Sequence, residues 1–164
     1  MAAGKGLFAK YPNRIFIETG SQLGGGIQQA LDEGFKVIYS IELLPELYMK
    51  CIKRFKDRPE VHLILGDSGR ILKALISIID EPITFWLDAH VGSESTPLIA
   101  ELESIKSHVI KTHTIIIDDL RDWKRERNGV DTELLKEKLL EINPDYTLVF
   151  EDGYMPKDIL VATI

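Results

Sequence analysis

Short apolar runs alternate with longer amphipathic segments along most of the chain, and this alternation predicts strands followed by helices. The strand candidates are nearly continuous β-branched or aromatic runs, whereas the helix candidates carry apolar residues three or four positions apart. Helices are expected after each of the first four strands and again from Asp131 to Ile142. Strands are expected at residues 15–17, 36–41, 61–65, 83–87, 114–117, 146–150 and 159–163.

This order predicts an α/β domain with a mostly parallel sheet covered by helices on both faces. The length of 164 residues suits one domain, with residues 1–13 as an N-terminal arm and residues 120–130 as a candidate lid loop. Right-handed connections bring the loops that follow the strands to one edge of the sheet. Ligands bind at that edge in open α/β sheets, so the residues there are the first candidates for chemistry.

Composition narrows the class of protein only a little. The chain has 26 acidic and 20 basic residues, a net charge of −6, which argues against a broad basic surface for nucleic acid. Cys51 is the only cysteine, which excludes an intrachain disulfide and a cysteine zinc cluster. No apolar leader or membrane span is predicted, so the expected location is cytoplasmic, and a homo-oligomer is left open.

A glycine-rich turn, Glu18 to Gly26, separates the first strand from the first helix. Glycines there permit positive φ and let a ligand approach the backbone, while the helix start offers unpaired N–H groups. The dinucleotide pattern G-x-G-x-x-G does not fit, because Gln29 stands where the third glycine belongs, and no Gly-Lys-Ser/Thr is present. The alternative is a plain tight turn.

Acidic residues also follow the second and third strands. Glu42 lies 22 residues after Gly20 and could accept hydrogen bonds from ribose hydroxyls, or it could be a solvated loop residue. Asp67 and Ser68 could hydrogen-bond an adenine amino group, and either could cap the following helix.

With these residues the chain resembles the class I S-adenosylmethionine-dependent methyltransferases. The resemblance implies a Rossmann-like, seven-stranded sheet of order 3-2-1-4-5-7-6 with the seventh strand antiparallel. It also implies that the glycine turn approaches the methionine part of the cofactor, that the second-strand acid holds the ribose and that the third-strand acid contacts adenine. The residues that it assigns to cofactor binding are Glu18, Gly20, Ser21, Gly24, Glu42, Asp67 and Ser68.

Three aspartates, Asp88, Asp118 and Asp119, follow the fourth and fifth strands and are expected to meet at the same edge. Clustered carboxylates repel one another unless a cation lies between them, and an all-oxygen set favours Mg²⁺, Mn²⁺ or Ca²⁺. The alternative is that Asp88 lies near the transferred methyl group without a metal and that Asp119 is solvated. The pattern resembles the metal-dependent O-methyltransferases, and the macrocin type more than the catechol type, because Asp-Asp replaces the usual Asp-Asn.

His90 follows Asp88 by two residues, and these two are the predicted catalytic residues, with His90 as a general base or a further metal ligand. Glu94 is a weaker candidate for the same role, and a structural histidine is the alternative. The charged stretch from Arg121 to Arg127 could cover the pocket and contact an anionic or sugar substrate, or could be a solvated loop.

The sequence therefore predicts an S-adenosylmethionine-dependent methyltransferase that methylates a hydroxyl of a small substrate, such as a sugar, with help from a divalent metal. Two alternatives remain. One is a metal-dependent α/β hydrolase that uses His90 and the three aspartates. The other is a non-catalytic binding module with a methyltransferase fold.

Overall fold

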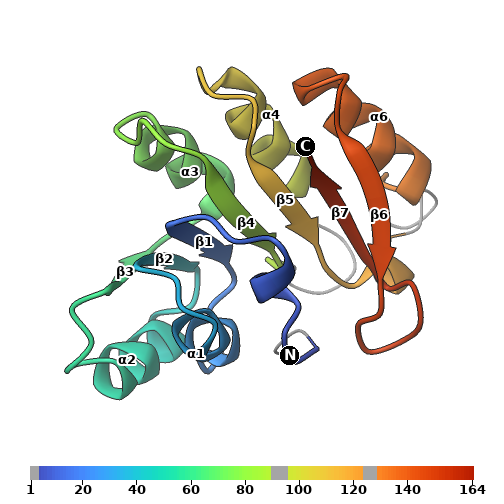
Figure 1. The fold of residues 1–164 in the computed structure, drawn as a ribbon. Coiled ribbons are helices and arrows are strands. Elements are labelled where there is room, and N and C mark those ends of the chain that lie inside the picture. The colour runs from blue at the N-terminus through green and yellow to red at the C-terminus, as the bar shows by residue number, and fades with distance from the viewer. Residues whose placement is uncertain (1–3, 90–95, 124–128) are drawn as a thin grey trace.

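Seven strands form a single sheet in the computed structural model, which describes residues 4–89, 96–123 and 129–164 (Figure 1). The strands are β1 Ile15–Thr19, β2 Val37–Glu42, β3 Val61–Leu65, β4 Ile83–Leu87, β5 Thr114–Ile117, β6 Thr147–Glu151 and β7 Ile159–Thr163. The α-helices are α1 Gly25–Asp32, α2 Pro45–Arg54, α3 Ser68–Ile76, α4 Leu98–Ser107 and α6 Thr132–Ile142. Two short 3₁₀ helices, η1 Phe8–Lys10 and η2 Leu120–Asp122, complete the described elements.

The strand order is β3-β2-β1-β4-β5-β7-β6, which confirms the predicted order. Strands β1 to β5 pair in parallel, while β7 runs antiparallel to both β5 and β6. In the centre of the sheet Thr19 pairs with Ile41 on one side and with Leu87 on the other. Strands β1 and β4 therefore end level with each other and β2 ends one residue later, so the loops that follow them begin next to one another.

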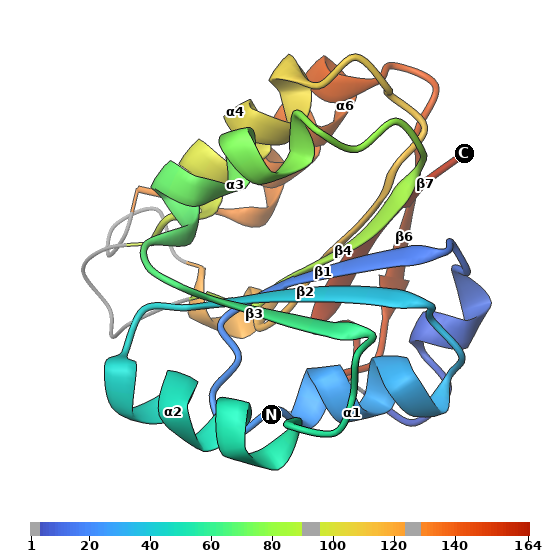
Figure 2. The same cartoon turned by 90° about the vertical axis from the view of Figure 1, so that its left-hand side faces the viewer.

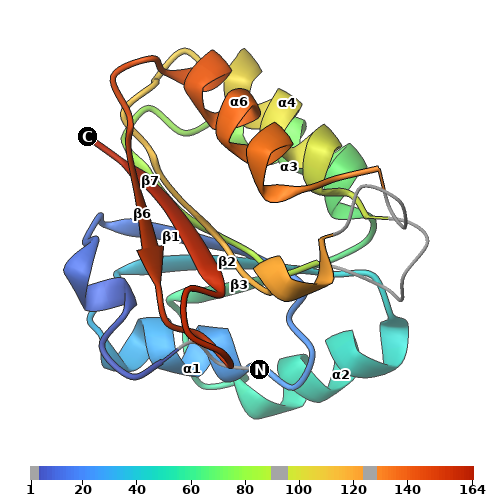
Figure 3. The same cartoon turned by 90° about the vertical axis from the view of Figure 1, so that its right-hand side faces the viewer.

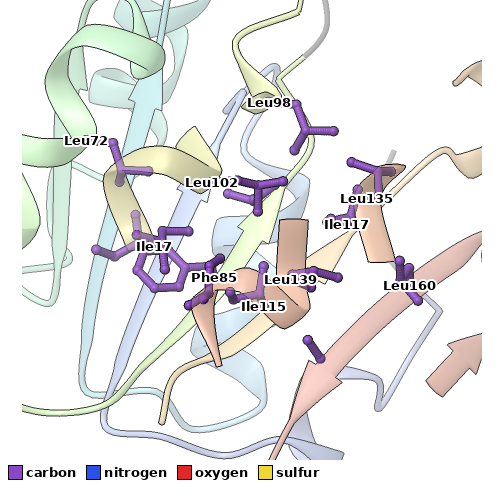
Figure 4. Packing of buried hydrophobic residues seen from close by; sticks show 14 of the residues in the cluster. Ile17, Leu72, Phe85, Leu98, Leu102, Ile115, Ile117, Leu135, Leu139 and Leu160 are labelled. Carbon is purple, nitrogen blue, oxygen red and sulfur yellow. The ribbon is translucent and has the colours of Figure 1, made fainter. Parts of the chain in front are cut away.

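Helices cover both faces of the sheet, α1 and α2 on one side and α3, α4 and α6 on the other (Figures 2 and 3). The larger core lies under α3, α4 and α6, where leucine and isoleucine side chains of helices and strands pack together (Figure 4). Strand residues Ile17, Phe85 and Ile115 are fully buried there. Burying one such side chain contributes about 1.5–3 kcal/mol, so this layer stabilises the central strands that carry the site.

The second core lies on the α1 face and includes part of the expected N-terminal arm. Phe8 of η1 is fully buried, with its ring centroid 4.8 Å from that of Phe16 and 5.2 Å from that of Trp86. The backbone N–H groups of Gly6 and Ala9 donate to the Glu33 carboxylate at the end of α1. The described part of residues 1–13 therefore packs against the domain.

Most element boundaries lie within two residues of the predicted ones. Helix α3 ends at Ile76, and Ile79, which continues the apolar spacing of that helix, is buried in the loop that follows. Thr96 accepts a hydrogen bond from the Leu98 N–H at 3.1 Å and so satisfies a backbone donor at the start of α4. Among the helices that the structure describes, none is long and apolar enough to cross a membrane.

At the edge of the sheet where β4 and β5 begin, two histidines form a buried hydrogen-bonded chain. The Ile83 N–H donates to Nδ1 of His113 at 3.1 Å, so the His113 proton must be on Nε2. That proton points to Nδ1 of His108 at 2.9 Å, and His108 in turn donates from Nε2 to the Ile79 carbonyl at 3.0 Å. The chain is consistent only when both rings are neutral.

Candidate functional site

A cavity of about 550 Å³ opens at the edge of the sheet where β1 to β4 end. Its volume falls within the range that is typical of small-molecule sites. Residues that follow all four strands contribute to its wall, together with the first turn of α2 and the start of α4. The lining residues include Gly20, Glu42, Leu44, Asp67, Ser68, Asp88 and Thr96.

Steric constraints explain three glycines in the turn after β1. Gly20 has a φ of 87°, and a Cβ atom there would lie 2.7 Å from the Asp88 carbonyl oxygen. Gly24 has a φ of 78° and faces the Phe55 ring, while a Cβ on Gly26 would overlap with the Glu18 carboxylate. The turn is therefore a close contact between β1, β4 and α1, and it exposes backbone to the cavity at Gly20.

Glu42, the last residue of β2, is buried in the wall of the cavity. Its Oε2 accepts from the Gln22 N–H and its Oε1 from the Leu44 N–H, each at 2.9 Å. Each carboxylate oxygen has two acceptor positions, so both oxygens retain capacity for a ligand hydroxyl. The two backbone contacts hold the carboxylate in one orientation, with its position fixed by the glycine turn and by the start of α2.

Glu18 lies beside the main cavity, in a smaller one of about 160 Å³ that also borders Ser21, Gly20 and Asp88. Ser40 of β2 donates to Glu18 Oε2 at 2.6 Å, which leaves Ser21 to donate to Ser40 at 2.6 Å. Burial raises the pKa of Glu18 to about 8; the Ser40 hydrogen bond opposes this rise, and the Asp88 charge adds to it. Glu18 therefore carries a proton for much of the time at neutral pH.

Asp67 and Ser68 occupy the start of α3. Asp67 Oδ1 accepts from the Gly69 N–H at 3.0 Å, which confirms the capping alternative without excluding a ligand contact. Ser68 donates to Oε1 of Glu101 at 2.5 Å, and Glu101 is fully buried in the first turn of α4. Burial raises the pKa of Glu101 to about 7. Ser68 lowers it, as does Thr19, although Thr19 Oγ1 and Glu101 Oε2 make no hydrogen bond of good geometry with any described residue.

Asp88, Asp118 and Asp119 meet at the ends of β4 and β5, as the sequence predicts. One carboxylate oxygen from each lies within 4.8 Å of the other two. The pKa of Asp118 is raised to about 6, chiefly by burial and also by the charge of Asp119. Asp119 has a φ of 57°, a left-handed conformation that aspartate tolerates better than most residues and that turns the chain directly after β5.

Arg121 provides a cation next to this cluster. Its Nη1 lies 2.6 Å from Asp119 Oδ1 and also pairs with Asp158, which is buried just before β7. The Arg121 guanidinium also lies over the Tyr154 ring at 5.0 Å. Arg121 is thus held by two aspartates and an aromatic ring, and the substrate contact suggested for this charged stretch stays a prediction.

Most predicted site residues are within the described part of the chain. Gly20, Glu42, Asp67, Ser68 and Asp88 line the main cavity, Glu18 and Ser21 line the smaller one, and Gly24 packs behind the turn. Asp118 and Asp119 line neither cavity, but their carboxylates lie close to that of Asp88. His90, Glu94 and residues 124–128 of the candidate lid lie outside the described residues.

Sequence reasoning missed Ser40, Glu101 and Asp158. Ser40 interrupts an otherwise apolar strand, and Glu101 stands at the inward spacing set by Leu98 and Leu102. A polar residue at a buried position of the pattern was the signal in both cases. Asp158 had no such signal, because its role depends on how the β6–β7 turn meets η2.

No family model matches the sequence, and no curated protein matches it either. Solved structures do match over most of the chain. The S-adenosylhomocysteine-bound methyltransferase PaMTH1 of Podospora anserina has a TM-score of 0.65 at 13% identity, over 92% of this chain and 71% of that one. A Staphylococcus aureus protein assigned as a caffeoyl-CoA O-methyltransferase has a TM-score of 0.64 at 12% identity, over 91% and 75%.

The glycopeptide N-methyltransferase MtfA, complexed with S-adenosylmethionine, has a TM-score of 0.62 at 11% identity, over 94% of this chain and 82% of that one. The strand order and the antiparallel β7 agree with these matches. The chain has the class I methyltransferase fold. Because O- and N-methyltransferases match this methyltransferase fold about equally well, the fold does not determine the acceptor atom.

Proposed function

We propose that the chain binds S-adenosylmethionine in the main cavity and transfers its methyl group to a small-molecule acceptor. The observation that carries this proposal is the buried Glu42 carboxylate, oriented by two backbone N–H groups at the wall of the cavity. The spare acceptor positions of Glu42 suit the two hydroxyls of a ribose. Gly20 supports the same proposal, because it lines the cavity with backbone in a conformation that side-chain-bearing residues rarely adopt.

The residues of the turn and of β4 would position the reacting groups. S-Adenosylmethionine supplies an activated methyl group, so that a methyl–oxygen bond forms as the methyl–sulfur bond breaks and the acceptor hydroxyl loses its proton. Asp88 borders both cavities, which supports its assignment to the place where an acceptor would meet the methyl group. His90 remains our proposal for the base that takes the proton, in the role that its spacing from Asp88 predicts.

The test of cofactor binding is calorimetric titration with S-adenosylmethionine and S-adenosylhomocysteine. Replacing Glu42→Gln removes the charge and places an amide donor next to two backbone donors, so we expect binding to weaken at least about tenfold. Glu46→Gln, on the exposed first turn of α2, is the matched control and should bind like the wild type. Absence of binding to the wild type would refute the proposal.

We further propose that the reaction is metal-assisted O-methylation of a sugar or another small hydroxylated molecule. The oxygen-only set of Asp88, Asp118 and Asp119 suits Mg²⁺, Mn²⁺ or Ca²⁺, and oxygens that share one such ion lie no more than about 4–5 Å apart. A bound cation would lower the pKa of the hydroxyl to be methylated. Asp118 and Asp119 would hold such a cation from β5 and Asp88 from β4.

Methyl transfer to a panel of sugars, catechols and amines, with and without chelator, tests this second step. We expect activity on hydroxyl acceptors that chelator abolishes, and that Asp118→Asn reduces by at least about a hundredfold. Activity that survives chelation would remove the metal from the proposal while the cofactor site stands. Hydrolysis of phosphate esters without S-adenosylmethionine would favour a hydrolase, and cofactor binding without any turnover a binding module.

A further inference from the structure

We infer that Glu101 is a positioning residue that fixes Ser68 as a hydrogen-bond acceptor toward the cavity, and so makes the site select a 6-amino purine over a 6-oxo purine. This inference rests on the proposed function, because it concerns the purine end of the same ligand. Glu101 belongs neither to the glycine turn nor to the aspartate cluster. The inference therefore depends on a separate observation, the hydrogen bond between Ser68 and Glu101.

The direction of one hydrogen bond is the first step. The Ser68 hydroxyl has one proton, and that proton is directed to Glu101 Oε1 at 2.5 Å, a distance typical of a bond to a carboxylate. Ser68 lines the cavity, so what remains for a ligand is the pair of acceptor positions on its oxygen. An exocyclic amino group can donate to them, whereas a carbonyl oxygen at the same place would meet only lone pairs.

The burial of Glu101 makes this arrangement rigid. Helices α3 and α4 approach closely at Gly69, where a Cβ atom would lie 3.2 Å from Cβ of Pro97 and 3.3 Å from Cβ of Ala100. Glu101, in the first turn of α4, is fully buried and bonded to Ser68 of α3. A purely structural role, in which Glu101 only ties α3 to α4, predicts a change in stability but no change in ligand preference.

The experiment compares the dissociation constants of S-adenosylhomocysteine and S-inosylhomocysteine, which differ at the purine 6-position. It is done at pH 8.5, above the pKa of Glu101, where the carboxylate can only accept. We expect the wild type to prefer the 6-amino ligand at least about tenfold, in line with the loss of a hydrogen bond at a buried polar group. Glu101→Met, which keeps the volume but removes the acceptor, should reduce this preference about five- to tenfold.

Two further variants complete the design. Ser68→Ala removes the acceptor oxygen itself and changes the side chain less than Glu101→Met does. It should reduce the preference for the 6-amino ligand by a similar factor, so it tests the inference even if Glu101→Met does not fold. Glu103→Gln, which removes an exposed acid on the same helix, should keep the wild-type ratio. A wild-type ratio in Ser68→Ala or in a folded Glu101→Met would overturn the inference while the proposed function stands. A wild type that binds neither ligand would refute the proposed function itself.

Discussion

Replacing His113→Asn is expected to make the stability of the domain less sensitive to acid. Burial lowers the pKa of His113 to about 4, and the charges of His108 and Lys111 contribute to the same shift. In the unfolded chain the histidine titrates near its ordinary value of about 6.5. Below that pH the unfolded state therefore binds a proton that the folded state rejects, and the contribution of neutral His113 to stability is lost as pH falls from about 6.5 toward 4.

The magnitude follows from the two pKa values. Since one pKa unit corresponds to about 1.4 kcal/mol, the full loss below pH 4 is about 3 kcal/mol, of which about 2 kcal/mol has occurred at pH 5. The hydrogen-bonded chain explains why the folded state rejects the proton. A second proton on His113 would put a donor at Nδ1, where the Ile83 N–H already donates.

The assay is urea unfolding at pH 7.5 and pH 5.0, with the free energy of unfolding extrapolated to water at each pH. The wild type and His113→Asn share the buried acids, so the effects of these acids cancel when the two pH differences are compared. We expect His113→Asn to lose about 2 kcal/mol less than the wild type between the two pH values. His62→Asn, on the exposed edge strand β3, is the matched control and should behave like the wild type. Equal losses in His113→Asn and the wild type would refute the reasoning.

Two further predictions concern the site. Gly26→Ala would press a methyl group against the buried Glu18 carboxylate and should lower the free energy of unfolding by about 1–3 kcal/mol in the same urea assay. Gly4→Ala, where the added methyl group would be at ordinary contact distance, is the control and should change the free energy of unfolding by less than about 0.5 kcal/mol. Arg121→Met removes the cation paired with Asp119 and should tighten Mn²⁺ binding about fivefold in a calorimetric titration, while lowering the melting temperature because Asp158 loses its buried partner. Unchanged Mn²⁺ affinity in Arg121→Met would mean that the guanidinium does not compete for this site.

The strands could be predicted from the sequence because each is a distinct apolar run bounded by turn residues, whereas their order in the sheet came from the resemblance to class I methyltransferases. Double-sided burial of β1 and β4 requires such runs, and every residue of both strands is buried. Boundaries were less accurate where side chains beyond the element are also buried. Ile79 continues the apolar spacing of α3, but its burial comes from packing under the loop after the helix has ended.

The candidate site was predictable to the extent that it depends on strand ends. Glu42, Asp88 and Asp118 each lie where an apolar run stops, and parallel pairing alone brings them to one edge. Contacts that depend on packing between elements were not predictable in the same way. The Glu101–Ser68 bond requires the distance between α3 and α4, and the Arg121–Asp158 pair requires the path of the β6–β7 turn.

The acids of this chain fall into two electrostatic groups, and the difference argues that the sheet edge is built for a ligand. Surface acids such as Glu81 and Glu141 are paired with arginine or lysine, and these partners lower their pKa. Glu18, Glu101 and Asp118 have pKa values raised to about 8, 7 and 6, in each case chiefly by burial. Burying carboxylates in this way costs folding free energy, which a fold with no ligand at this edge could avoid by placing apolar residues there. Glu18 borders the smaller cavity, Glu101 is bonded to Ser68 in the wall of the main cavity, and Asp118 lies close to Asp88, which borders both. The cost is therefore concentrated at this edge of the sheet, where a cationic ligand would offset it.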